Sequence, residues 1–317
     1  MSDSMSERLV IALGGNALIK PGQSGTLPEQ LATLEESLGS IVELIRHGHR
    51  IALTHGNGPQ VGNILLRVEE ARGKAYDIPL DVCVAQSQGE MGYLIQRTLS
   101  NLLRRSGIAR PVVTVLTQVL VDPADPQGRV PTKPIGPFYT AAQAEELKQK
   151  GYALMEDAHR GYRRVVPSPR PVRIVEQEVI SALFESGVIV IAVGGGGIPV
   201  VLTEGEMLAG IEAVVDKDLA SSLLATALGA DRLLDLTAVE NVKLYFGTPQ
   251  ERALERMTLT EARRYLAEGH FAPGSMGPKI EAAIAFLERG GREVIITRPE
   301  MAVAALQGRA GTHIYPD

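Results

Sequence analysis

Short runs of β-branched and other apolar residues alternate along the chain with longer segments of helical spacing, and this alternation limits the possible folds more than any other feature. The apolar runs are typical of buried strands and cover residues 8–13, 50–54, 111–121, 188–193, 232–237 and 293–297. The segments of helical spacing cover residues 31–46, 91–106, 174–186, 217–227, 259–267 and 279–289. Because apolar strands that alternate with helices are typical of a parallel sheet covered on both faces, the pattern predicts an α/β protein.

The size and composition of the chain limit its domain organisation and its function. At 317 residues, we expect two lobes that share one sheet, or two domains. Hydrophobic residues make up 44% of the chain and charged residues 22%, which excludes a disordered protein. The formal net charge of −5 argues against a nucleic-acid-binding protein, because a duplex is bound through a basic face. A small anionic substrate stays compatible with this charge, since lysines can gather locally in a cleft.

Two features bear on the cellular compartment. Cys83 is the only cysteine, so an intrachain disulfide cannot form, which fits a reducing compartment and predicts a cytoplasmic protein. The first residues lack the basic and apolar regions of a signal peptide, and the longest apolar stretch, residues 188–202, is interrupted by four glycines and a proline. We therefore expect no membrane span.

One segment, residues 122–170, breaks the alternation and is rich in proline, glycine and arginine. A connection of this length without its own structure is either functional or disordered. The aromatic residues Phe138, Tyr139, Tyr152 and Tyr162 indicate a small folded unit. We expect an antiparallel subdomain that lies over a cleft.

Three of the expected strands end in glycine. Gly14 and Gly15 follow the first strand, Gly56 and Gly58 follow the second, and residues 194–197 are four glycines after a later strand. Glycine at the end of a strand lets backbone N–H groups approach a bound anion, and a following helix N-terminus adds partial positive charge. One such cluster is commonly only a tight turn. Three clusters at strand ends favour an anion site at one edge of the sheet.

The missing motifs and the setting of three lysines narrow the kind of anion site. A GxxxxGK[ST] motif is absent, which excludes a P-loop NTPase, and the glycine spacing disfavours a Rossmann dehydrogenase. The HRD and DFG elements of protein kinases are absent as well. Lys133 lies in a proline-rich stretch, Lys217 lies between Asp216 and Asp218 at a helix start, and Lys279 follows a glycine-containing turn. Phosphoryl transfer requires positive charge placed in this way.

Eight motifs together resemble those of carbamate kinases, which belong to the amino acid kinase fold. In chain order they are ALGGNAL, HGNGPQVG, QSQGEMGY, PTKPIGPFY, RRVVPSP, GGGGIPV, EAVVDKDLAS and FAPGSMGPK. The resemblance runs from about Leu9 to the C-terminus, and PTKPIGPFY and GSMGPK are its most specific parts. Ala238 and Glu240 stand where members of the family often carry Gly or Asp, which affects details of the adenine loop and removes no charged catalytic group.

The resemblance implies a three-layer αβα sandwich with an open, mainly parallel sheet and a small protruding subdomain. It places carbamate in an N-terminal lobe, residues 8–205, of which residues 122–170 form a lid. It places the nucleotide in a C-terminal lobe, residues 206–317. It also implies a homodimer, with the helix at residues 86–103 near the contact.

The resemblance also implies roles for individual residues. Lys217 and Lys279 would neutralise the phosphates, and Asp218, ranked ahead of Asp216, would hold their two ammonium groups. Lys133 would reach in from the lid and cover carbamate. The residues expected to cradle carbamate and the transferring phosphoryl group are Gly14, Gly15, Asn16, Gly56, Asn57, Gly58, Gly195 and Gly196, with Asn16 counted among the catalytic residues. The residues expected at the nucleotide are Thr237, Ala238, Tyr245 and Met276.

The implied reaction is a direct, reversible transfer of the γ-phosphoryl group of ATP to a carbamate oxygen, which yields carbamoyl phosphate and ADP. The expected role is ATP formation in arginine catabolism, with Mg²⁺ held mainly by the nucleotide phosphates and few protein ligands. Carbamate already carries a nucleophilic oxygen anion, so we expect His55 to be structural. Two alternatives stay open: a related amino acid kinase that acts on another carboxylate, and a nucleotide-sensing protein of the same fold that lacks catalysis.

Overall fold

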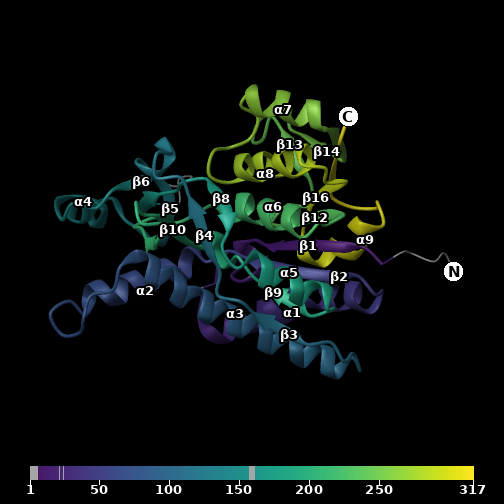
Figure 1. Ribbon diagram of the computed structural model, residues 1–317. Helices are drawn as coiled ribbons and strands as arrows, with labels where there is room; N and C mark the ends of the chain where they lie inside the picture. The colour runs from purple at the N-terminus through teal and green to yellow at the C-terminus, as the bar shows by residue number, and fades with distance from the viewer. Residues whose placement is uncertain (1–5, 21, 24, 157–160) are drawn as a thin grey trace.

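The central sheet carries strands from both halves of the chain (Figure 1). The computed structural model describes residues 6–20, 22–23, 25–156 and 161–317, with Asn16 described by its backbone only. In order across the sheet, the strands are β15 (Arg256–Thr258), β17 (Thr312–Tyr315), β16 (Glu293–Thr297), β12 (Arg232–Leu236), β1 (Arg8–Leu13), β2 (Arg50–His55), β9 (Ile189–Ile191) and β3 (Val112–Thr114). Neighbouring strands run parallel, except that β16 and β17 are antiparallel. The predicted open, mainly parallel sheet is therefore confirmed.

Helices cover both faces of this sheet. Alternate residues of each strand point to opposite sides, and the apolar residues on both sides need a covering layer. Leu9 and Ile11 of β1 pack into a core with one set of helices, and Val10 packs into a second core with another set. The first set is α1 (Leu27–Arg46), α3 (Leu80–Arg105) and α9 (Ala302–Leu306). The second set is α5 (Gln177–Glu185), α6 (Lys217–Ala227), α7 (Leu259–Ala267) and α8 (Met276–Glu288). The three-layer αβα arrangement follows from these two cores.

A second sheet, which the sequence analysis missed, adjoins the first. Its strands, in order, are β11 (Leu208–Gly210), β10 (Ile198–Leu202), β4 (Gln118–Val121) and β8 (Pro171–Ile174). The expected single strand over residues 111–121 is wrong, because the chain leaves the first sheet after β3 and enters the second at β4. At the break, the backbone N–H of Thr117 donates to the side chain of Gln88, at 2.8 Å, and not to a neighbouring strand.

Two of the predicted helices, α6 and α7, begin and end at the residues expected, and others differ. α2 (Gly58–Glu70) was not predicted, since its glycine-containing start looks like a loop. α3 begins at Leu80 and not at residue 91, and its first turns pack against the subdomain instead of the main core. The helix expected from residue 174 begins at Gln177, because the preceding residues form β8. The helix expected from residue 279 begins three residues earlier, at Met276.

The segment 122–170 contains the predicted antiparallel subdomain, which protrudes from the sandwich at the left of Figure 1. Its strands lie in the order β5 (Pro131–Tyr139), β7 (Tyr162–Pro167) and β6 (Leu154–Glu156), with α4 (Ala141–Gln149) between β5 and β6. The remaining elements are the hairpin β13 (Val242–Leu244) and β14 (Arg252–Leu254), and the 3₁₀ turns η1 (Gly15–Ala17), η2 (Pro126–Gly128), η3 (Gly194–Gly196) and η4 (Pro299–Met301).

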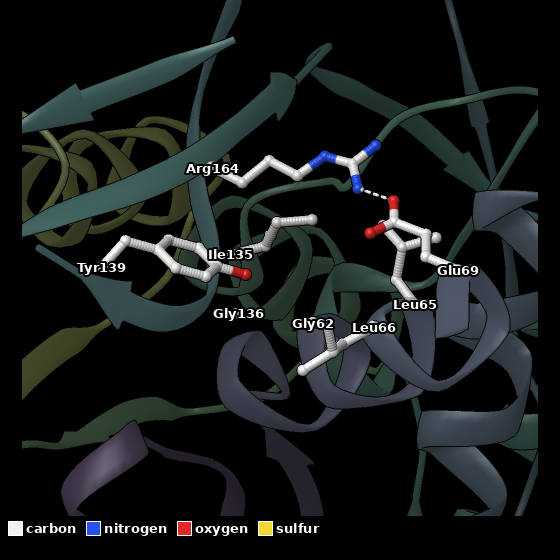
Figure 2. A pocket seen from close by; sticks show the side chains of 8 residues that line it. All are labelled: Gly62, Leu65, Leu66, Glu69, Ile135, Gly136, Tyr139 and Arg164. Carbon is white, nitrogen blue, oxygen red and sulfur yellow. Dashed lines mark hydrogen bonds and ion pairs between the residues drawn. The ribbon is translucent and has the colours of Figure 1, made fainter. Parts of the chain in front are cut away.

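The subdomain is fastened to α2 by a close backbone contact and an ion pair. Figure 2 shows Arg164 of β7 reaching Glu69 of α2, and the two side chains form an ion pair. Beside this pair, Gly62 of α2 and Gly136 of β5 meet, and the void left between the two elements is about 10 Å³, the room that a single water needs. A small apolar cluster completes the contact, with Val61, Ile64, Leu65, Cys83, Val84, Ile135, Val166 and Val214 among its members.

We expect Gly62→Ala to push the subdomain away from α2. A Cβ atom at residue 62 would lie 1.9 Å from Cα of Gly136, and a backbone atom cannot turn aside as a side chain can. Overpacking of this kind costs roughly 1–3 kcal/mol of unfolding free energy. Gly39→Ala on α1 is the matched control, because nothing lies within 4 Å of its Cβ position, and it should stabilise the protein by up to about 1 kcal/mol. Chemical denaturation measures both variants, and a Gly62→Ala protein as stable as Gly39→Ala would contradict the contact.

The expected lobe boundary after residue 205 falls in the turn between β10 and β11, where the N–H of Thr203 donates to the carbonyl of Met207. Since β1 and β2 lie in one sheet with β12 and β16, both proposed lobes share a continuous sheet. The boundary itself stays a prediction. Among the described residues, none of the helices combines the length and the apolar character needed to cross a bilayer.

Candidate functional site

A cleft of about 1300 Å³ opens at the carboxyl edge of the central sheet, below the subdomain. Gly15 follows β1, Gly56 and Gly58 follow β2, and Gly195 follows β9, and all four glycines border the cleft. Because β1, β2 and β9 are neighbours in the sheet, the three glycine turns meet at one place. Ligands of open α/β sheets bind at this edge. The structure therefore brings the predicted turns together.

The glycine turns pack against each other too closely for larger side chains. A Cβ atom on Gly14 would lie 2.7 Å from the carbonyl oxygen of Leu236. Gly195 has φ of +64°, and a Cβ atom there would lie 2.0 Å from the side-chain amide of Asn57. Gly196, with φ of +95°, meets the carbonyl oxygen of Val215 in the same way. Glycine is thus required where Gly195 approaches the second turn, and where Gly14 and Gly196 approach neighbouring backbone.

Helix α3 holds two of these turns from behind. The side-chain amide of Asn57 donates to the hydroxyl of Ser87 at 2.7 Å. The amide of Gln88 donates to the carbonyl of Gly194 at 2.9 Å and to that of Thr117 at 3.1 Å. Both α3 side chains are fully buried, so these hydrogen bonds fix the positions of the turns without competition from water. These hydrogen bonds give a structural role to the QSQGEMGY motif, to which the sequence analysis assigned none.

Two of the predicted lysines meet at Asp218, which borders the cleft. Lys217 is the first residue of α6, and its ammonium group forms an ion pair with Asp218. Lys279, in the first turn of α8, lies 3.3 Å from both carboxylate oxygens of the same Asp218. Burial alone would raise the pKa of Asp218, but Lys217 and Lys279 outweigh burial, and the pKa lies below its ordinary value. Asp218 is therefore an ionised carboxylate that contacts both ammonium groups.

The sequence analysis missed a second carboxylate in this cluster. Asp235 of β12 accepts hydrogen bonds from Lys279 at 2.9 Å to each oxygen, and one oxygen lies 3.7 Å from Lys217. Asp235 is only 4% exposed. Its burial, followed by the negative charge of Asp218, raises the pKa of Asp235. A signal was present in the sequence, since an ionisable residue inside an apolar strand needs a partner of opposite charge.

Lys133 reaches the same region from the subdomain. Its ammonium group forms an ion pair with one oxygen of Asp216, and both residues border the cleft. The other oxygen of Asp216 accepts the backbone N–H groups of Asp218, at 2.8 Å, and Leu219, at 3.3 Å, and so caps α6. The two candidate carboxylates thus have separate partners: Asp218 contacts Lys217 and Lys279, whereas Asp216 contacts Lys133.

His55 lies at the end of β2, directly before the cleft glycines. Burial lowers its pKa to about 4, and Nδ1 lies 2.9 Å from the carbonyl oxygen of Gly56. The ring is 1% exposed and packs against Gly194, where a Cβ atom would lie 2.3 Å from Nε2. These contacts are those of a neutral structural histidine.

The residues predicted at the nucleotide are placed less directly. The described residues that border the cleft do not include Thr237, Ala238, Tyr245 or Met276. Tyr245 has φ of +54° and makes an edge contact with His270, with ring centroids 4.5 Å apart. Gly274, Ser275 and Gly277, around the start of α8, do border the cleft. Asn16 lies in the 3₁₀ turn after β1.

The carboxylates of Asp216, Asp218 and Asp235 are engaged by lysines. Within the described ranges, three or more His, Cys, Asp or Glu side chains do not gather in a way that could hold a metal ion.

Comparison with known proteins gives the class to which this fold and cleft belong. The family model described as the amino acid kinase family matches residues 7–298, and the chain belongs to this family. Within the family, a carbamate kinase of Pyrococcus horikoshii is 50% identical over 316 residues, which are 98% of this chain and 100% of the relative. A structure of carbamate kinase from Giardia lamblia bound to citric acid has a TM-score of 0.94 at 43% identity, over 99% of each chain. A second structure, bound to AMP-PNP, has a TM-score of 0.89 at 44% identity, over 99% of each chain. The predicted family and fold are confirmed.

Proposed function

We infer that the protein is a carbamate kinase, an ATP-dependent enzyme that reversibly transfers a phosphoryl group between ATP and carbamate. The observation that carries this inference is that Lys217 and Asp218 border one cleft with three glycine turns, beneath Lys133 of the subdomain, and that Lys279 pairs with the same Asp218. The near full-length identity to a carbamate kinase supports the choice of carbamate as acceptor.

In the mechanism that we propose, the chain supplies charge and position. The backbone N–H groups of the turns at Gly15 and Gly56–Gly58 would cradle carbamate and the transferring phosphoryl group. Lys217 and Lys279 would stabilise the negative charge that the phosphoryl oxygens carry in an in-line displacement. Lys133 would cover the acceptor from above and help to exclude water. A general base is not required, which agrees with the buried, neutral His55.

The nucleotide would bind on the side of α8, whose first turn borders the cleft. Its adenine would lie near Thr237, Ala238, Tyr245 and Met276, and the AMP-PNP complex of the Giardia lamblia enzyme supports nucleotide binding in this fold. Mg²⁺ bound to the phosphates would add positive charge there. ATP formation in arginine catabolism is the role that we propose for the reaction.

The assay that tests this function combines the purified protein with Mg²⁺, ADP and carbamoyl phosphate. We expect ATP to form, because the proposed reaction is reversible and the cleft would accept a carbamoyl group beside a phosphoryl group. Acetyl phosphate, offered at the same concentration, is the control for the acceptor. Efficient ATP formation from acetyl phosphate, with none from carbamoyl phosphate, would show a related acyl kinase instead.

We also propose a cytoplasmic homodimer with α3 near the contact. The outward face of α3 exposes apolar side chains at helical spacing, with Val82 37% and Tyr93 58% exposed. The nearby β10–β11 hairpin adds Met207, 70% exposed. Sedimentation velocity tests the proposal, and a monomer at micromolar concentration would contradict it.

The buried thiol of Cys83, whose pKa is raised to about 11 by burial, fits a protein without disulfides.

A further inference from the structure

Lys279 has every hydrogen-bond donor engaged by a carboxylate. An ammonium group has three N–H donors. Lys279 Nζ lies 2.9 Å from both oxygens of Asp235 and 3.3 Å from both oxygens of Asp218. Lys217 borders the cleft, whereas Lys279 is absent from the described residues that border it. In this state Lys279 has no free donor for a phosphate.

Asp235 depends on Lys279 for its own charge. Its neighbours in the sheet are Ala12 of β1 and Ile296 of β16, which are apolar and buried. The charged groups that face it are Lys217 and Asp218 of α6 and Lys279 of α8. Lys217 is 3.7 Å away and is already paired with Asp218. If Lys279 turned toward a phosphate, Asp235 would be left as a buried carboxylate without a close partner.

A buried carboxylate that loses its partner takes up a proton, because the charged form is no longer stabilised. Burial and Asp218 already raise the pKa of Asp235, so protonation is the accessible response. The resting cluster has two ammonium groups against two carboxylates and is neutral. Protonation of one carboxylate leaves a net positive charge beside the bound phosphates.

We propose that Asp235 holds Lys279 back from the cleft in the resting enzyme and takes up one proton from solution when nucleotide phosphates draw Lys279 forward. The proton adds to an Asp235 oxygen, Lys279 keeps its three protons, and no other bond changes. Asp235 is thus a positioning residue that acts through Lys279. The proposal rests on the proposed function, since it requires that nucleotide phosphates bind at this cluster.

Calorimetric titration of the protein with MgADP at pH 8 tests the proposal. At this pH the nucleotide phosphates are already ionised, so they contribute no proton change of their own. Titrations in two buffers with different ionisation enthalpies give the number of protons taken up from the difference in binding enthalpy. We expect about one proton for the wild-type protein, and almost none for Asp235→Asn, because an amide cannot take up the proton.

The affinity for MgADP gives a second readout. Asp235→Asn should bind MgADP about tenfold more tightly, since a neutral amide holds Lys279 less firmly than a carboxylate does. Asp235→Glu keeps a carboxylate and should restore the proton uptake. Asp231→Asn is the matched control. Asp231 precedes the same strand at its other end and accepts a hydrogen bond from the backbone N–H of Arg8. This variant should behave as wild type.

The possible outcomes separate the proposal from the proposed function. Binding without proton uptake by the wild-type protein would overturn this proposal alone. Uptake that persists in Asp235→Asn would overturn it as well, and would assign the proton to another group such as His55. If Asp235→Asn does not fold, Lys279→Ala replaces it, because without the ammonium group no partner can leave and the uptake should vanish. Failure of the wild-type protein to bind MgADP would overturn both the proposal and the nucleotide site.

Discussion

Replacing Lys217 or Lys279 with alanine is expected to slow turnover by roughly 10²–10³-fold, the usual effect of losing one preorganised donor to developing charge. Both side chains are about nine-tenths buried beside the cleft, where a charge would interact with bound phosphates more strongly than it does in water. Each lysine also contacts Asp218, so either loss changes the position of the other ammonium group. The initial rate of ATP formation from ADP and carbamoyl phosphate measures the effect.

A surface lysine in the same half of the chain provides the control for this prediction. Lys243 forms an ion pair with Glu251 and its side chain is 36% exposed, so Lys243→Ala should keep normal turnover. Both cluster variants should remain folded, because the sheet and its two cores are unchanged, and circular dichroism checks this. Near-normal turnover by either cluster variant would show that the lysine is not catalytic.

Lys133→Ala is expected to abolish most of kcat/KM for carbamoyl phosphate while the affinity for ADP changes less than about threefold, or ~0.7 kcal/mol. Carbamate is too small to supply much binding energy, so its capture should depend on charge brought by the subdomain as water leaves. Lys133 comes from β5 and pairs with Asp216, whereas the proposed nucleotide contacts lie beyond β12. Calorimetric ADP binding and steady-state kinetics on the same preparation separate the two effects.

Lys148→Ala, on α4 of the same subdomain, is the control for Lys133→Ala. Lys148 is 48% exposed and its ion pair is with Glu145 of the same helix, so its loss should change neither ADP binding nor kcat/KM. A loss of ADP binding in step with activity in Lys133→Ala would assign Lys133 to the nucleotide site or to folding. The lid role would then be wrong.

The sequence predicted the elements whose structure is set by local pattern. The strands at residues 8–13 and 293–297 and the helices α6 and α7 are found where apolar spacing placed them. The second sheet was missed because its strands pair β4 with β8 and β10, residues distant in the chain, and local pattern carries no information on such pairing.

The candidate site shows the same division between local and distant information. Glycines at strand ends and lysines at helix starts can be recognised from their immediate neighbours. The structure brings the glycine turns and Lys217 to one cleft, with Lys279 joined to them through Asp218. Asp235 could not be placed in the same way, since its role depends on Lys279, 44 residues later. The pairing of Asp216 with Lys133 spans 83 residues and could not be predicted from local sequence either.

The continuous sheet determines which distances in the active enzyme can vary. β1 and β2, which carry the proposed acceptor turns, and β12, which leads to the proposed adenine loop, are hydrogen-bonded side by side in one sheet. Neighbouring strands in a sheet lie about 4.8 Å apart, a spacing that hydrogen bonds keep nearly constant. A large hinge motion between the two proposed lobes would therefore have to bend or break this strand pairing. The protruding subdomain lies outside the sheet and meets the cleft through the pair of Lys133 with Asp216, so we expect it to be the part that responds to the smaller substrate.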